Sequence, residues 1–493
     1  MDVQQVENVK DPKYQMIIEN FRFFGIGCIL YGILFAICLY YGFFGISVPI
    51  LTIGTQIYLI LCFKRLQLDR NKKSYFYLVT WLLLGISNCL TGSGNLVFFN
   101  TCGMFLLFLC FLFENYFHTE KWGFDKFLLE LIVTPFAAVG NVDAFILSAH
   151  HFFTVKEEKK NSKVKYVWLG ILIAIPLLIV ILALLASADV VFKNILFHFS
   201  WNFMPKRPIW FIILFVVGIF GSHGILAYLS GKVMNEVKEK EKKWEPVVGI
   251  TFLSILTIVY LVFSVIQISY LFLGEFTLPS GVTYAEYARS GFFQLLFVCL
   301  INLATILICI SFFREQKALK IILTIFSACT YIMLASSAMR MILYIEAYQL
   351  TFLRLIVLWA LVVIAISLIY CLITIYKPDF RLFSCITITV TVCYLVLSFA
   401  RPDYVIAKYN LVSGKEKADL SYLFSLSSDA VAAMDEEGLI EDILINEEFY
   451  DRAYPQTLPS HYYIWDESIL SFNFSHYKAR NIIDGYLKDS ELF

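Results

Sequence analysis

Tyr166–Leu185 (YVWLGILIAIPLLIVILALL) is the stretch of sequence that decides the class of fold. It contains no charged residue, and as a helix it is long enough to cross about 30 Å of hydrocarbon while its backbone groups pair internally. The chain returns to such apolar runs about eleven times between Phe21 and Ala400. This repetition predicts an all-α fold, a polytopic transmembrane helical bundle of about eleven spans.

The composition agrees with a membrane protein. Hydrophobic residues make up 59% of the chain and charged residues 16%, whereas about a quarter of an ordinary globular chain is charged. The spans are predicted near residues 21–42, 44–63, 74–91, 95–113, 166–186, 208–229, 247–273, 290–313, 319–337, 352–376 and 382–400. The transmembrane domain therefore covers residues 21–400, and we expect its surroundings to be the lipid bilayer.

Short basic loops predict the orientation of the spans, because Lys and Arg concentrate in short loops on the cytoplasmic side. The Lys/Arg-rich loops are 64–73, 155–165, 231–244 and 314–320. Residues 1–20 are polar, with no small-residue cleavage site after the first apolar run, so we interpret that run as an uncleaved span. With eleven spans, the N-terminal segment is expected to be cytoplasmic and the chain beyond residue 401 extracytoplasmic, in a multi-pass protein of the cell membrane.

Residues 127–153 complicate the count of crossings. This stretch is apolar but is interrupted by Pro135, Gly140, Asn141 and Asp143. Because basic loops lie on both sides, it must cross the membrane an even number of times, which predicts a re-entrant or interfacial helix pair. One full crossing would invert every downstream span.

The tail, residues 401–493, differs in composition from the rest of the chain. It holds eight Lys and Arg residues against seventeen Asp and Glu residues. Ala418–Met434 has apolar residues at helical spacing, and aromatic residues continue almost to the end. A disordered acidic tail would have few aromatics, so we predict a small, mainly helical soluble domain that is acidic and extracytoplasmic.

Signatures of chemistry are sparse. The sequence has no phosphate-binding G-x-x-x-x-G-K-[ST] loop, no H-E-x-x-H helix and no G-x-S-x-G elbow. Its twelve cysteines lie inside apolar runs, without a CxxC pair or a Cys/His spacing suited to zinc. We therefore expect no metal, no cofactor and no catalytic residue, and no nucleic-acid partner.

Two groups of ionisable and aromatic residues near the predicted outer face remain as candidate ligand-binding residues. Charges at this depth are costly unless paired or hydrated, which makes them functional candidates. Arg340, Tyr344 and Tyr348 follow helical spacing of four, and Glu286 and Arg289 form an i, i+3 pair. The first group is Glu275, Tyr284, Glu286, Tyr287 and Arg289, and the second is Arg340, Tyr344, Glu346, Tyr348 and Arg354. The alternative interpretation is that they are interfacial anchors reaching out to water.

Three phrases resemble those of a known bacterial family: YAEYARSGFFQLL at 284–296, MRMILYIEAYQLTFLR at 339–354 and DLSYLFSLSSDAVAAM at 419–434. They are similar to the hallmarks of domain of unknown function 4173, which is related to domain of unknown function 4153. RPDYVIAKYNL at 401–411 resembles the link after that family's last span. One departure is Gln349, where the family is expected to have Gly, so continuity of that helix is in question. The resemblance implies a bacterial membrane location and a helical C-terminal appendage, without an activity.

Three functions fit the sequence. The first is a non-catalytic envelope-associated sensor, scaffold or accessory protein that binds an envelope protein through its C-terminal domain. The second is a transporter or lipid translocator in which arginines hold an anionic lipid or solute. The third is an intramembrane transferase at the outer leaflet, with Glu286 or Glu346 as general base and Arg289 or Arg340 holding a phosphate.

Overall fold

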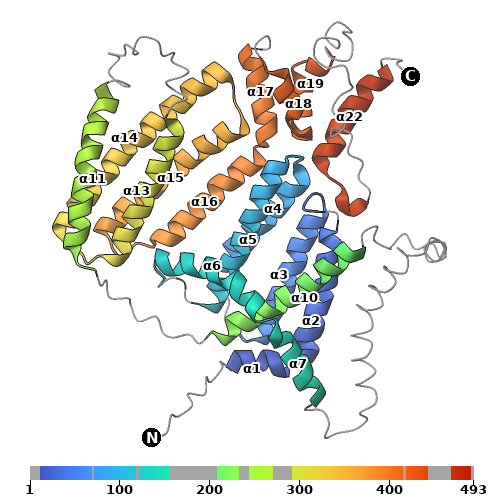
Figure 1. Cartoon of the computed structure of the whole chain (residues 1–493). Helices are drawn as coiled ribbons and strands as arrows, with labels where there is room; N and C mark the ends of the chain where they lie inside the picture. The colour runs from blue at the N-terminus through green and yellow to red at the C-terminus, as the bar shows by residue number, and fades with distance from the viewer. Residues whose placement is uncertain are drawn as a thin grey trace, which may run out of the picture.

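The computed structural model describes residues 12–40, 42–68, 71–117, 119, 122–154, 208–232, 244–269, 291–414, 418–441 and 468–489. Within these ranges the ordered elements are helices, which confirms the predicted all-α fold (Figure 1). Nine of them are long and apolar enough to cross a membrane. They are α2 (Phe21–Leu39), α3 (Ser47–Arg65), α5 (Gly94–Tyr116), α10 (Pro208–Gly231), α11 (Pro246–Gln267), α13 (Phe292–Phe312), α14 (Lys317–Tyr348), α15 (Phe352–Tyr376) and α16 (Leu382–Phe399).

These nine helices lie at nine of the predicted spans, but the span predicted to end at residue 337 continues in α14 to Tyr348. The span predicted at 74–91 is α4 (Ser74–Leu90), a shorter apolar helix of 17 residues. The span predicted at 166–186 lies outside the described residues. The agreement follows from length, because runs of about twenty apolar residues have few alternatives to a helix.

The interrupted stretch at 127–153 forms two helices, α6 (Phe124–Gly140) and α7 (Asp143–Thr154), which meet at a bend of 46°. The break falls at Asn141 and Val142, between Gly140 and Asp143, which also interrupt the apolar pattern. Close packing holds the pair to α10, because a side chain at Gly224 would start 2.4 Å from the carbonyl oxygen of Ala138. Only a helix without a side chain there can approach so closely.

The helices form two groups with separate apolar cores. The first group contains α2–α6 and α10, and its core includes Phe24, Phe63, Leu84 and Phe113. The second group contains α11 and α13–α15, with Phe326 and Leu368 in its core. α16 contacts α15 on one side and α4 on the other, so it joins the two groups (Figure 1).

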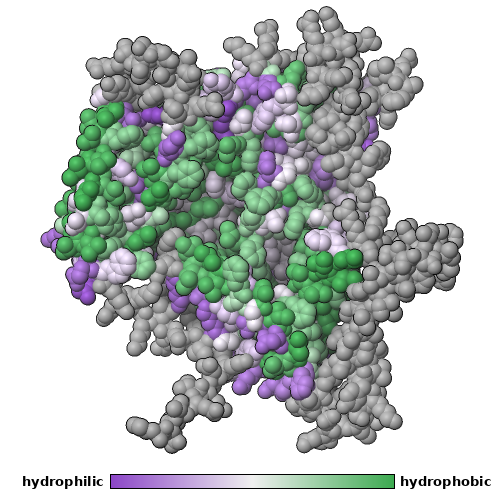
Figure 2. Space-filling view, in the orientation of Figure 1, coloured by the Kyte–Doolittle hydropathy of each residue, from purple (hydrophilic) through white to green (hydrophobic). Residues whose placement is uncertain are grey.

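The outside of the bundle is apolar. Figure 2 shows hydrophobic residues spread over the visible faces of α11 and α10. On α3 the exposed residues Ile50, Ile53, Ile57 and Leu61 follow helical spacing. An exposed apolar stripe on a long apolar helix is the surface that lipid covers.

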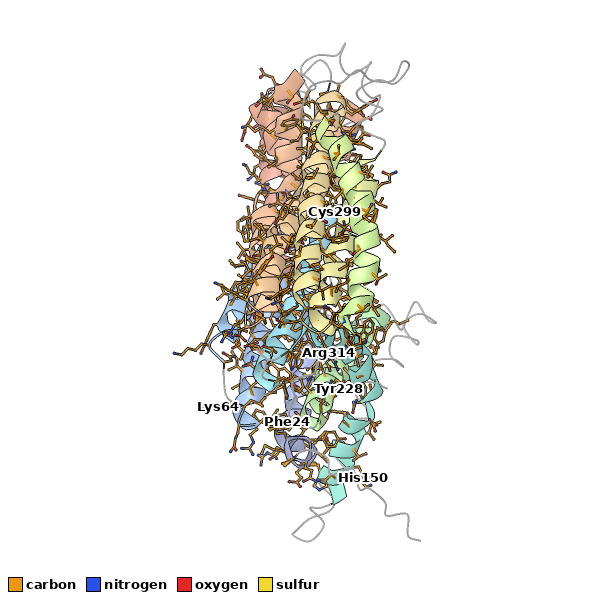
Figure 3. The ribbon with its side chains drawn as sticks, turned by 90° about the vertical axis from the view of Figure 1, so that its left-hand side faces the viewer. Phe24, Lys64, His150, Tyr228, Cys299 and Arg314 are labelled. Atoms are coloured by element: carbon orange, nitrogen blue, oxygen red, sulfur yellow. The ribbon has the colours of Figure 1, made fainter. Side chains whose placement is uncertain are left out.

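Basic residues mark one end of the bundle. Lys64 and Arg65 end α3, and Arg314 lies between α13 and α14. Figure 3 shows Lys64 and Arg314 in the lower part of the molecule, below the tail helices. Arg314 Nη1 lies 3.1 Å from Glu245 Oε1, just before α11 begins, so helix ends of the second group meet there.

The tail forms short helices that pack on the opposite end of the bundle. They are α17 (Pro402–Gly414), α18 (Leu420–Ser425), η5 (Ser428–Ala430), α19 (Val431–Glu436), η7 (Ile469–Ser471) and α22 (Phe474–Asp489). Apolar tail residues, among them Leu423, Val431 and Ile483, continue the apolar core of the second helix group. The domain boundary at residue 401 stays a prediction.

Candidate functional site

The predicted site residues divide between described and undescribed parts of the chain. Glu275, Tyr284, Glu286, Tyr287 and Arg289 lie outside the described residues. Arg340, Tyr344, Glu346 and Tyr348 lie in the last turns of α14, and Arg354 lies in the first turn of α15.

Arg340 is buried inside the second helix group. It is 7% exposed, and its Nη2 donates to Oε1 of Gln267 at the end of α11, at 3.2 Å. The same oxygen accepts a hydrogen bond from Ser336 Oγ at 2.6 Å. Gly291 makes room for the guanidinium, because a side chain there would start 2.8 Å from Arg340 Nη1. The fold thus buries this cation among α11, α13 and α14.

Tyr344, Tyr348 and Arg354 form a second arrangement at the end of α14. The Arg354 guanidinium lies 4.1 Å from the ring centre of Tyr344, a cation–π geometry. Its Nη1 also donates to the carbonyl oxygens of Tyr348, at 2.6 Å, and Gln349. The last carbonyls of a helix have no partner within it, so Arg354 caps α14 from the next helix.

Arg340 and Tyr344 both lie against the start of α13, Arg340 beside Gly291 and the Tyr344 ring 5.6 Å from the ring of Phe292. The rings of Tyr344 and Tyr348 are 5.0 Å apart, as expected for neighbours on one face. The Arg340 guanidinium, one turn earlier, also donates to Gln267 on α11. Glu346 is exposed. Whether any of these residues binds a ligand stays a prediction.

The sequence analysis did not identify a row of buried polar residues between α11, α13 and α14 that leads to Arg340. We call this row the polar seam. Tyr260 on α11 donates to Asn302 Oδ1 on α13 at 3.0 Å, and Asn302 Nδ2 donates to Thr330 Oγ1 on α14 at 3.1 Å. The other buried polar members are Thr257, Ser264, Gln267, Ser336, Ser337 and Arg340. The sequence signal was available, since Thr257, Ser264 and Gln267 recur at helical spacing within an apolar run.

The link between α14 and α15 is held by the tail. Gln349 ends α14 with φ 67° and ψ 171°, so the helix does break there, with Gln in place of the expected Gly. Leu350 N donates to Asn410 Oδ1 on α17 at 2.8 Å, and Asn410 Nδ2 donates back to Leu350 O at 2.9 Å. Phe352 N donates to the Tyr422 hydroxyl at 3.1 Å. The tail thus supplies partners for backbone groups that the break leaves without helical ones.

A second contact joins the tail to the α4–α5 turn in the first helix group. The side chain of Asp429 is fully buried and accepts hydrogen bonds from Thr91 Oγ1 and from Arg401 Nη2, the latter at 2.9 Å. Asn473 Nδ2 donates to the carbonyl oxygen of Thr91 at 2.8 Å. Nearby, burial raises the pKa of the Asp403 carboxyl, which accepts from Ser427 N.

Buried polar residues also bind α16 to the first group. Asn100 on α5 accepts from Tyr394 and Ser398 on α16 through Oδ1, at 2.7 and 2.9 Å. Its Nδ2 donates to Asn88 Oδ1 on α4 at 2.8 Å. Interhelical hydrogen bonds of this kind hold helices together in lipid.

In the described part of the chain no three His, Cys, Asp or Glu side chains group as they would around a metal ion.

Long apolar helices, buried interhelical hydrogen bonds and a lipid-facing apolar surface define the class: this is a polytopic α-helical membrane protein. The chain belongs to the family described as Domain of unknown function (DUF4153), whose model matches residues 78–437. That match confirms the resemblance through the related family; the narrower assignment to family 4173 is not confirmed. Comparison with curated proteins and with solved structures gave no match.

Proposed function

We propose that this protein is a non-catalytic, envelope-associated sensor, scaffold or accessory protein of the bacterial cell membrane. Its N-terminus would be cytoplasmic, as the basic end of the bundle suggests, and its tail extracytoplasmic. The observation that supports this proposal is that the tail is hydrogen-bonded to both helix groups. Asn410 holds the α14–α15 link and Asp429 holds the α4–α5 turn.

This arrangement suits a protein that reports an external contact. A partner that shifts the tail would act on both helix groups at once, because the tail's buried polar groups cannot leave their partners without a free-energy penalty. Two of the described site residues already serve within the chain. Arg354 caps α14, and Arg340 bonds Gln267. A structural use for these cations fits an accessory role without chemistry.

The exposed face of α22 offers a place to test for an envelope partner. Asn481 is exposed on this helix, and a photoreactive benzoylphenylalanine there would report proteins bound to the tail of the full-length chain in its own cells. We expect one discrete protein adduct, identifiable by mass spectrometry, whose yield is unchanged in Arg340→Gln and Glu346→Gln backgrounds. Adducts with many abundant proteins and none specific to this chain would contradict a scaffold.

A transporter or lipid translocator is the second candidate, and the polar seam between α11, α13 and α14 favours it. Polar residues inside a membrane bundle are costly and are therefore candidates for substrate and ion pathways. Mass spectrometry of molecules retained by the gently purified protein tests it. A specific anionic ligand that is retained by the wild type and lost in Arg340→Ala, with folding intact by gel filtration, would replace the scaffold proposal with this one.

The transferase alternative predicts a different result. If Glu346 acted as a general base, Glu346→Gln would stop product formation while preserving side-chain shape. This alternative needs the acid and the cation at one reacting position, whereas Glu346 is exposed on α14 and Arg340 is buried and bonded to Gln267 on α11. No observation on the described residues favours this alternative.

A further inference from the structure

The tail carries a short segment with unusually exposed apolar side chains. Residues 469–477 comprise η7 and the first turn of α22. Ile469 is 85% exposed, Phe474 50% and Tyr477 52%. Phe472 contacts both aromatic neighbours, with its ring centre 5.2 Å from that of Phe474 and 5.7 Å from that of Tyr477. Phe472, Phe474 and Tyr477 thus form an aromatic cluster, and the exposed Ile469 lies three residues before it in the chain; we call residues 469–477 the apolar cluster of the tail.

This segment is fixed to the end of the membrane helices. Ile46 N, just before α3, donates to the Phe472 carbonyl oxygen at 3.0 Å. Gly45 lies so close to the segment that a side chain there would start 2.7 Å from the carbonyl carbon of Ser471. Asn473 anchors the other side through the Thr91 carbonyl oxygen. The exposed cluster therefore has a set position relative to the start of α3.

The lipid-facing surface of the bundle leads directly to this position. The exposed stripe on α3 runs from Leu61 through Ile57 and Ile53 to Ile50, near the end that contacts the tail. Phe43, in the turn before α3, is also an exposed apolar residue, at 46%. Because α3 begins two residues after Gly45, the apolar cluster of the tail lies beside the end of a lipid-covered face.

We infer that residues 469–477 form an interfacial anchor that inserts Ile469, Phe474 and Tyr477 into the headgroup region of the adjoining leaflet. The occupant of this surface is phospholipid, since the surface continues one that lipid already covers. Aromatic residues with a polar tip are favoured at this depth.

Photocrosslinking of the full-length chain in nanodiscs of phosphatidylethanolamine and phosphatidylglycerol tests this inference. Benzoylphenylalanine would replace Phe474 in one variant and Asn481 in a matched control. Asn481 lies on the same exposed face of α22, seven residues and about 10 Å further along the helix axis. We expect phospholipid adducts at position 474 in several-fold higher yield than at position 481.

Two results would overturn the anchor. Equal lipid adduct yields at the two positions would show that the cluster is no closer to the bilayer than the control. In intact cells, a protein adduct at position 474 in place of lipid would make the cluster a protein-binding surface. Only monodisperse protein from gel filtration would be scored, so an unfolded variant cannot imitate either result. The scaffold proposal is tested by a protein adduct at position 481, whereas the anchor is tested by lipid adducts at position 474. Either proposal can therefore fail without the other.

Discussion

Asn410 and Leu350 exchange two hydrogen bonds, although sixty residues separate them in the sequence. Leu350 N donates to Asn410 Oδ1 at 2.8 Å, and Asn410 Nδ2 donates to Leu350 O at 2.9 Å. Asn410 is 1% exposed and Leu350 6%. One tail side chain thus satisfies both backbone groups of a residue at a helix break, which makes the tail part of the membrane fold.

Replacing Asn410 by Leu should strongly destabilise the protein. The substitution keeps a similar volume but leaves the amide and carbonyl of Leu350 buried without these partners, at a penalty of about 1–3 kcal/mol for each group. We expect a free energy of unfolding lower by about 2–5 kcal/mol in a fixed detergent, measured by reversible chemical unfolding. Asn481→Leu, on an exposed face, is the control. Equal effects of the two substitutions would contradict this role.

Gln349→Gly should stabilise the protein. Gln349 has φ 67° and ψ 171°, a backbone region almost confined to glycine, where other residues lose about 1–3 kcal/mol. Glycine removes this strain but also the hydrogen bond from Asp419 N to Gln349 Oε1 at 3.3 Å. We expect a net gain of about 1 kcal/mol by the same unfolding assay, and a loss for Gln349→Val, because a β-branched residue adopts this conformation poorly. A loss for Gln349→Gly as large as that for Gln349→Val would refute the assigned strain.

The sequence predicted the spans well because their cause is local. Runs such as Phe292–Phe312 have no charge to exclude them from lipid, and their length fixes the helix. The break at Asn141 was likewise visible as a cluster of residues that interrupt helices. These features depend on neighbours in the chain.

The candidate site was harder to predict because its contacts are long-range. Helical spacing placed Arg340, Tyr344 and Tyr348 on one face, but it could not show that the Arg340 guanidinium donates to Gln267 on another helix. The contacts of Asn410 and Asp429 with the bundle carry no periodic signal either. They depend on how the tail meets the two helix groups, which only the three-dimensional arrangement reveals.

Asp403 should make stability fall as the pH rises. Burial raises the pKa of its carboxyl, with the nearby Asp429 adding to the shift, so the folded protein binds the proton more tightly than the unfolded chain. The stabilisation that this tighter proton binding gives the folded protein is therefore fully present below the unfolded pKa of about 4. It is lost as the pH rises through the pKa of the folded state. We expect Asp403→Asn, which retains an acceptor for Ser427 N, to remove this pH-dependent loss and to stabilise the protein at neutral pH.

Asp419 provides a control of opposite sign. Hydrogen bonds from the Ser421 hydroxyl and the Tyr422 amide lower the pKa of its carboxyl, so its contribution is present above the unfolded pKa and lost as the pH falls through the folded value. We expect the stability of each variant relative to the wild type to depend on pH with opposite sign. Between pH 3 and pH 7, the difference in free energy of unfolding between variant and wild type should rise for Asp403→Asn and fall for Asp419→Asn. The same direction for both would show that Asp403 is not the source of the effect.

Arg401 and Asp429 should behave as one unit in a double-mutant cycle. Asp429 is fully buried and lies 2.9 Å from Arg401 Nη2, whereas the Arg401 side chain is 29% exposed, so removing Arg401 leaves a poorly solvated charge and removing Asp429 does not. We expect Arg401→Met to lower the free energy of unfolding by about 3 kcal/mol and Asp429→Asn to lower it by less. The double variant should lose less than the sum of the two, with a coupling of about 1–3 kcal/mol. Lys408 and Glu436 form an exposed pair 2.6 Å apart between α17 and α19. Because water screens that pair, it should show no measurable coupling. Additive losses for Arg401 and Asp429 would mean that this ion pair within the tail contributes no coupling, and that Asp429 acts through the hydrogen bond that Thr91 donates to it from the first helix group.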